Sequence, residues 1–191
     1  MSRASTTYGW PNSVTYLTHL NLLQEAATLA ASGTDYSNTD LLVVMTNPDA
    51  GAINNGPALV ASAGQGISVP GRTAPINNAT NSGRDLLYWG GTWLNHEVGH
   101  LLSLPDLYQY SSSNAHLHVG EWSLMGLISG RGREFSAFER WQLGWIDDAQ
   151  IHCAPSGVSD VVLTPLELAG GQKAVVVPLT QHRALVIESR R

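Results

Sequence analysis

The sequence predicts an α+β fold, and three observations support this prediction. Apolar residues recur at helical spacing in Val14–Ala31, which lies between Pro11 and Gly33. A second helical segment near residue 96 carries two histidines four positions apart. Short apolar runs that favour strands lie at Asp40–Thr46 and again beyond Asp160. Helices and strands therefore both contribute to the fold.

The elements before that second helix follow in order. Val14–Ala31 is expected to be a helix that backs the sheet, and Asp40–Thr46 a buried strand. Asn47–Gly91 is dense in Gly, Asn, Pro and Ser, and its candidate strands are Ala58–Ala61 and Gly66–Val69. An ordinary loop is the equal alternative for Gly66–Val69.

The second helix is expected to run from about Trp93 to Ser103. Gly90-Gly91 break the preceding segment, and Thr92 is a natural N-cap. Because the residue before a proline avoids the α region, Leu104 should be extended, and Pro105 should end the helix.

This helix contains His96-Glu97-Val98-Gly99-His100, the most informative pattern in the chain. Residues four apart lie on one helix face, so His96 and His100 can offer two imidazole nitrogens to one ion. Catalytic zinc takes three protein ligands and a water, and a neighbouring carboxylate, here Glu97, can accept the proton of that water. The pattern is the zinc hydrolase helix motif.

Asp106 is the candidate third ligand, because it follows the helix where the chain would have to turn back toward the metal. A chance match to the three fixed positions of the motif would be expected about 0.01 times in such a chain. The alternative is that His96 and His100 are ordinary surface or core residues of a helix without metal. The other positions for a third ligand are Glu121, His116 and His118.

Downstream of the motif the sequence predicts an irregular segment, Tyr108–Gly132, and then a helix, Glu134–Leu143. His116 and His118 could share one face of a strand and bind a second ion, but solvated loop histidines are the preferred interpretation. Glu139-Arg140 is expected either as a buried pair or as two exposed charges.

The tail is predicted to form strands separated by turn residues, which is typical of a small β segment. The candidate strands are Val161–Leu163, Ala174–Leu179 and Ala184–Ile187. We therefore expect one domain at residues 1–148 and a β-rich segment at 149–191 that continues into further chain.

Composition indicates a globular chain. With 191 residues, 43% of them hydrophobic and 13% charged, the chain is large enough to bury a core. The net charge of −5 and the scattered basic residues give no footprint for nucleic acid. No apolar run has the length of a membrane span, and Met1-Ser2-Arg3 does not begin a signal peptide. The single cysteine, Cys153 in the connector Ile151–Gly157, excludes an internal disulfide. We expect a monomer.

Three blocks of sequence together resemble a known peptidase family. The run HEVGHLLSLPDLY matches the extended metzincin zinc signature, in the snapalysin-type variant whose third ligand is Asp. The matching residues are His96, Glu97, His100 and Asp106. With GEWSLMG at 120–126 and FSAFERWQLGWID at 135–147, in that order, the chain is similar to the immune inhibitor A-like metallopeptidases of bacteria.

The resemblance implies a zincin-type α+β fold with a twisted mixed sheet, a backing helix, an active-site helix, a lower-subdomain helix and a short β segment. It implies one catalytic Zn²⁺ on His96, His100 and Asp106, and a secreted protein. Met125 would be the Met-turn residue below the metal, with a plain core role as the alternative. An edge strand that pairs with extended substrate is also implied, and Gly66–Val69 is the candidate.

The chain departs from the family pattern at two places. Metzincins place Gly where this chain has Ser103, and Ser in a left-handed conformation costs about 1 kcal/mol more than Gly. Many relatives have an acidic, glycine-rich loop where this chain has Ser37-Asn38-Thr39-Asp40, so calcium is not predicted there. Tyr108 and Tyr110 are open candidates for the residue that steadies the oxyanion.

The motif and the resemblance together predict a zinc-dependent endopeptidase, with protein or peptide substrates and Glu97 as general base. One alternative is a non-proteolytic binding module with a retained zinc site. Glu97 argues against it, because a structural site closes all four positions with ligands. The other alternative is a zinc hydrolase of non-peptide amides, and the sequence leaves it open.

Overall fold

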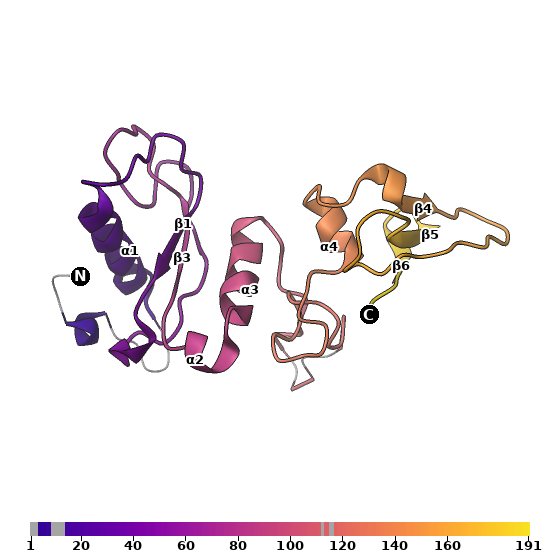
Figure 1. Cartoon of the computed structure of the whole chain (residues 1–191), viewed down its shortest axis with the longest axis horizontal. Coiled ribbons are helices and arrows are strands. Elements are labelled where there is room, and N and C mark those ends of the chain that lie inside the picture. The colour runs from indigo at the N-terminus through magenta and orange to yellow at the C-terminus, as the bar shows by residue number, and fades with distance from the viewer. Residues whose placement is uncertain (1–3, 9–13, 112, 115–116) are drawn as a thin grey trace. The chain divides into compact units, whose positions relative to one another are not determined.

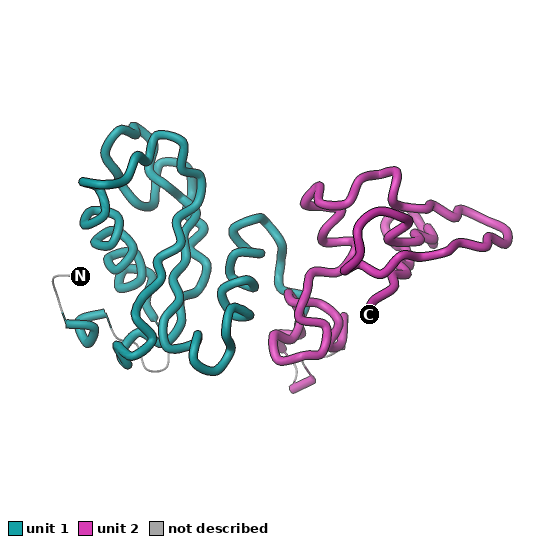
Figure 2. Tube along the Cα trace, in the orientation of Figure 1, with its two compact units in different colours: residues 1–107 teal, residues 108–191 magenta. Residues whose placement is uncertain are grey.

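The computed structural model describes residues 4–8, 14–111, 113–114 and 117–191, so the candidate ligand His116 lies outside the described residues. The chain divides into two units, Met1–Leu107 and Tyr108–Arg191, drawn in teal and magenta in Figure 2. Each unit combines helix with a three-stranded sheet, so the predicted α+β class is confirmed. No helix among these residues is long and apolar enough to cross a membrane.

The sheet of the first unit is mixed and has the order β1-β3-β2. Its strands are β1 (Leu42–Met45), β2 (Leu59–Val60) and β3 (Asn78–Ser82). β1 runs parallel to β3, and β2 runs antiparallel to it. β1 is shorter than predicted and only half-buried, since it lies at one edge of the sheet.

The central strand, β3, is the strand of this sheet that the sequence did not predict. Its residues are mostly polar, yet Thr80, Asn81 and Ser82 are completely buried. Neighbours satisfy the two buried hydroxyls: that of Thr80 donates to the Gly56 carbonyl at 3.0 Å, and that of Ser82 donates to Asp85 at 2.7 Å. Because most residues of β3 are polar, the strand lacks the apolar pattern that predicts a buried strand. The hydrogen bonds of its hydroxyls make its burial possible.

The predicted edge strand Gly66–Val69 is wrong. Ile67 makes only an isolated bridge to Ile76. The Gln24 side chain takes the place of a strand partner, because its Nε2 donates to the Ser68 carbonyl and its Oε1 accepts from the Ser68 amide, both at 2.9 Å. The edge strand opposite β1 in this sheet is β2, which lies inside the other candidate segment, 58–61.

Helix α1 (Tyr16–Ala30) confirms the predicted N-terminal helix and packs against this sheet (Figure 1). Thr15 caps it by accepting a hydrogen bond from the Thr18 amide. The buried core between helix and sheet consists of Leu23, Ala27, Tyr36, Leu59, Ile67, Val69, Ile76 and Ala79. Two helices follow the sheet, α2 (Leu86–Trp89) and α3 (Thr92–Leu101). Short 3₁₀ helices lie at Ser5–Thr7, Pro48–Ala50 and Asp148–Gln150.

The second unit contains α4 (Ala137–Gln142) and a sheet of order β4-β5-β6. The strands are β4 (Ile151–Cys153), β5 (Ala174–Thr180) and β6 (Arg183–Glu188). β4 pairs parallel with β5, and β6 pairs antiparallel with β5. The buried core of this unit joins α4 to the tail through Ala137, Ile146, Leu166 and Ala174.

Three predictions for the second unit need correction. Helix α4 begins at Ala137 and not at Glu134, because Ser136 and Glu139 form a capping box. The segment that holds Cys153 is strand β4 and not a connector, and the cysteine is exposed. Val161–Leu163 is not a strand, since only Leu163 makes an isolated bridge.

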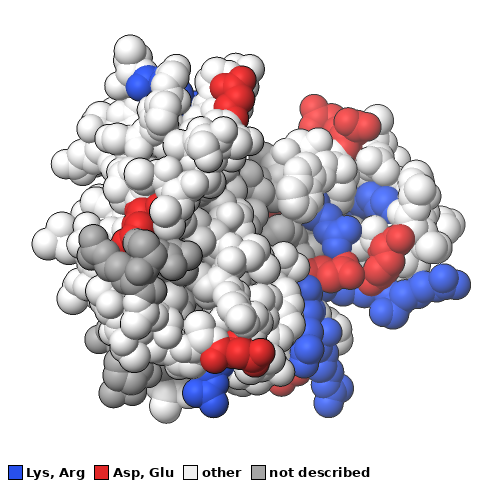
Figure 3. Space-filling view, turned by 60° about the vertical axis from the view of Figure 1, so that its left-hand side comes forward, with Lys and Arg blue, Asp and Glu red and all other residues white. Residues whose placement is uncertain are grey.

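Charged side chains on the second unit are interspersed. Figure 3 shows acidic and basic groups next to each other there. Two of the ion pairs are Arg140 with Glu134 and Arg190 with Glu188. Glu139 is buried but does not pair with Arg140, so neither form of the Glu139-Arg140 prediction is correct.

Candidate metal centre

Helix α3 begins one residue earlier than the sequence predicted. Its N-cap is Gly91, whose carbonyl accepts the first helical hydrogen bond from the Asn95 amide at 2.9 Å. The prediction of Thr92 as N-cap is therefore wrong. Gly90, at φ 58°, separates α3 from the short helix α2, a conformation that glycine adopts without steric cost.

The C-terminus of α3 is closed by a Schellman motif. The Ser103 amide donates to the His100 carbonyl at 2.9 Å, and the Leu104 amide donates to the Gly99 carbonyl at 3.0 Å. Ser103 has φ 72° and is the one non-glycine residue with positive φ in the described part of the chain. Ser103 thus adopts the left-handed conformation that glycine, the metzincin residue at this position, adopts without steric cost. The left-handed residue Ser103 reverses the direction of the chain before Pro105, so that Asp106 lies back near the helix.

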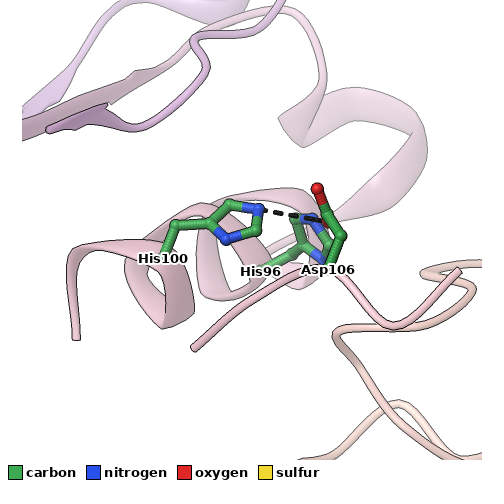
Figure 4. A group of neighbouring side chains, drawn as sticks. All are labelled: His96, His100 and Asp106. Atoms are coloured by element: carbon green, nitrogen blue, oxygen red, sulfur yellow. Dashed lines mark ion pairs between the residues drawn. The ribbon is translucent and has the colours of Figure 1, made fainter. Parts of the chain in front are cut away.

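The three predicted ligands converge at this point (Figure 4). Nε2 of His96 lies 3.1 Å from Oδ1 of Asp106, and Nε2 of His100 lies 3.2 Å from the same oxygen. The two imidazole rings are perpendicular, with centroids 4.7 Å apart. In the described residues this is the group of His, Cys, Asp and Glu side chains that could hold a metal ion.

The distances from Asp106 to the two histidines fit a tetrahedral metal site. Two ligands that each lie about 2.0–2.1 Å from one zinc ion are about 3.3 Å apart, close to the separations seen here. Nδ1 of His100 lies 2.8 Å from the Leu104 carbonyl. That carbonyl can only accept, so Nδ1 carries the proton and Nε2 is left unprotonated for a metal. Two imidazoles and one carboxylate are a donor set that suits zinc.

Glu97 is buried beside this group and does not belong to it. Its Oε2 accepts a hydrogen bond from the Ala58 amide at 2.6 Å. Burial raises the pKa of Glu97 to about 7, while the Ala58 hydrogen bond and the electrostatic interaction with His100 act in the opposite direction. The charges of Asp106 and Asp85 add to the increase in pKa.

Sequence reasoning missed Ala58 as the partner of Glu97. The Ala61 amide donates to the Asn77 carbonyl at 2.8 Å, so the main chain of Ala61 faces β3. Main-chain groups alternate between the two edges of a strand, and those of Ala58 therefore point to the outer edge, where Glu97 meets them. A backbone contact between residues 39 apart leaves no pattern in the sequence.

Met125 lies in the second unit and is completely buried. It stands in a turn, in which the Gly126 amide donates to the Ser123 carbonyl at 3.0 Å. The Met125 amide donates to the Ser123 hydroxyl at 3.0 Å, and that hydroxyl donates to Glu139 at 2.8 Å. The turn is therefore anchored to α4, and the place of Met125 below a metal stays a prediction.

The other candidate residues have local partners. His118 is hydrogen-bonded to Gln109, and Oε2 of Glu121 lies 3.7 Å from Nε of Arg131. The rings of Tyr108 and Tyr110 contact each other, with centroids 4.8 Å apart. None of these contacts indicates a ligand or an oxyanion donor.

Comparisons of the chain with protein-family models, with curated proteins and with solved structures return no match. The function is therefore inferred from the geometry of the residues themselves.

Proposed function

We propose that the chain is a zinc-dependent endopeptidase of the metzincin type, whose metal ligands are His96, His100 and Asp106. The observation that carries the proposal is the convergence of three donor atoms beside a buried carboxylate that is not one of them. Three ligands leave one position of a tetrahedral zinc site for water, which is the arrangement of catalytic and not structural zinc.

Zinc in this site would acidify its water and polarise the scissile carbonyl. Glu97 is the general base of the proposal. Its Oε2 is held by the Ala58 amide, so the carboxylate keeps a fixed orientation and Oε1 is the oxygen that takes up a proton. Glu97 then passes this proton to the leaving amine. His100 keeps its own proton on Nδ1, facing the Leu104 carbonyl, and does not take part in the transfer.

A peptide suits the site better than a small amide because a strand edge adjoins it. β2 is an edge strand of its sheet, and the main chain of Val60 points to the same outer edge as that of Ala58. An extended peptide can add to such an edge through main-chain hydrogen bonds. This placement favours hydrolysis of peptide bonds over hydrolysis of other amides.

The test is digestion of a denatured protein mixture by the zinc-loaded chain, with cleavage sites mapped by mass spectrometry. We expect internal cleavage that a zinc chelator abolishes and added zinc restores. Glu97→Gln should retain one zinc per chain while peptide hydrolysis falls by at least about 10²-fold, the usual effect of a positioned base. Cleavage that persists in the chelator, or in Glu97→Gln, would refute the proposal. A chain that binds zinc and cleaves nothing would support the binding-module alternative.

A further inference from the structure

A pocket of about 240 Å³ opens beside strand β2. One wall comes from the start of α1 and the two residues before it, and the other comes from the chain around β2. The residues of the two walls are Val14, Thr15, Tyr16 and His19, and Pro57, Leu59 and Val60. This volume is below the roughly 300–1,000 Å³ of small-molecule sites, and it suits a single side chain.

The pocket is uncharged. Among the described residues its lining contains no Lys, Arg, Asp or Glu, and its one histidine is His19. His19 is buried, and burial lowers its pKa to about 4, so the imidazole is neutral at physiological pH. A neutral wall of aliphatic and aromatic groups favours an apolar occupant, because a charged group would lose its hydration there without a partner.

The pocket adjoins the proposed catalytic site through one residue. Ala58 lines the pocket, and its amide donates to Glu97. The next residue whose main chain faces the same outer edge is Val60, which also lines the pocket and is 62% exposed. A peptide paired with this edge therefore runs past both the pocket and Glu97.

We propose that this pocket is a specificity site, which binds one large apolar side chain of an extended peptide paired with β2. Strand addition gives affinity through the main chain and selectivity through pockets for alternate side chains. The pocket therefore selects peptides with a residue such as Leu, Met or Phe at one fixed distance from the scissile bond. This inference rests on the proposed function, since it uses the same strand edge to hold the substrate.

The first test is cleavage of a peptide library by the zinc-loaded chain and by two pocket variants. Val60→Asp places an anion at the rim, and we expect the preference at one substrate position to change from apolar residues to Lys and Arg, by about tenfold. Tyr16→Ala enlarges the pocket, and the preference should move toward Trp. The matched controls are Leu87→Asp, at a residue that is also 62% exposed, and Leu17→Ala, beside Tyr16; neither residue lines the pocket.

The second test measures binding without cleavage. Metal-free chain is titrated with two extended hexapeptides that differ only in one position, Leu or Ala, and binding is followed by NMR shifts of the Val60 and Tyr16 amides. We expect about tenfold tighter binding of the Leu peptide, and no such difference for Val60→Asp. If the pocket variants change neither the cleavage preference nor the difference in affinity between the Leu and Ala peptides, the inference is overturned while the peptidase proposal stands. If binding responds but nothing is cleaved, the pocket stands and the peptidase proposal fails.

Discussion

Ser103 carries a backbone conformation that an L side chain adopts at a cost, and Ser103→Gly should remove that cost. The residue has φ 72° and closes the Schellman motif after α3. A left-handed conformation costs a non-glycine residue about 1–2 kcal/mol. Glycine gains freedom in the unfolded chain, which offsets about 0.4–1 kcal/mol of this benefit. The net stabilisation should therefore be about 0.5–1 kcal/mol.

The hydrogen bonds of the motif do not depend on the Ser103 side chain. Both come from main-chain amides, those of Ser103 and Leu104, so the substitution keeps them. Ser103 is exposed, and no buried contact is lost. For a chain of this length the gain corresponds to about 2 °C in melting temperature. Thermal denaturation followed by circular dichroism measures it.

Two matched variants show whether the gain comes from the backbone. Ser103→Ala keeps the Cβ atom, so it should not stabilise the chain. Ser62→Gly changes another exposed serine of the same unit, one without a positive φ, and should slightly lower the melting temperature through the entropy of the unfolded chain. The reasoning is refuted if Ser103→Gly melts at or below the temperature of the unaltered chain, or if Ser62→Gly gains as much.

Three further predictions concern the third ligand, a buried histidine and the tail. Asp106→Ala should lower zinc affinity by well over tenfold in a chelator competition and abolish hydrolysis. Asp106→His should restore partial zinc binding. If Asp106→Ala still binds one zinc per chain, the third ligand lies elsewhere. His19 has a lowered pKa, so its contribution to stability is complete above about pH 6.5 and is lost as the pH falls toward 4, by roughly 3 kcal/mol at most. His19→Gln should flatten this acid loss in denaturant titrations, whereas the exposed control His182→Gln should not. A chain that ends at Asp148 should keep its zinc but melt at a lower temperature, because Ile146 would lose Leu166 and Ala174; unchanged melting would contradict this.

The features that the sequence predicted correctly depend on local spacing. The two histidines lie one turn apart on a helix, whatever the rest of the chain does, and α1 has a helical apolar pattern and a capping threonine. The convergence of Asp106 on the histidines needs only six residues beyond His100. Local geometry fixes such features, so the residue pattern alone is enough to predict them.

The features that the sequence could not predict depend on contacts between distant residues. Strand β3 is polar, and its burial becomes possible only because partners such as Gly56 and Asp85 satisfy its hydroxyls. Ser68 was expected in a strand, but a side chain 44 residues away takes its hydrogen bonds. The Glu97–Ala58 contact joins a side chain to a main-chain amide, which any residue but proline supplies. No residue type marks these positions.

The spacing of six residues between His100 and Asp106 follows from the way the helix ends. Leu104 contributes twice, because its amide donates to the Gly99 carbonyl and its carbonyl lies against Nδ1 of His100. The same residue thus closes the helix and sets the tautomer of a ligand. Only after this reversal can the next side chains face back to the histidines, and Asp106 is the first carboxylate to do so. The strained Ser103 therefore helps to bring the three candidate ligands together, because its left-handed conformation turns the chain.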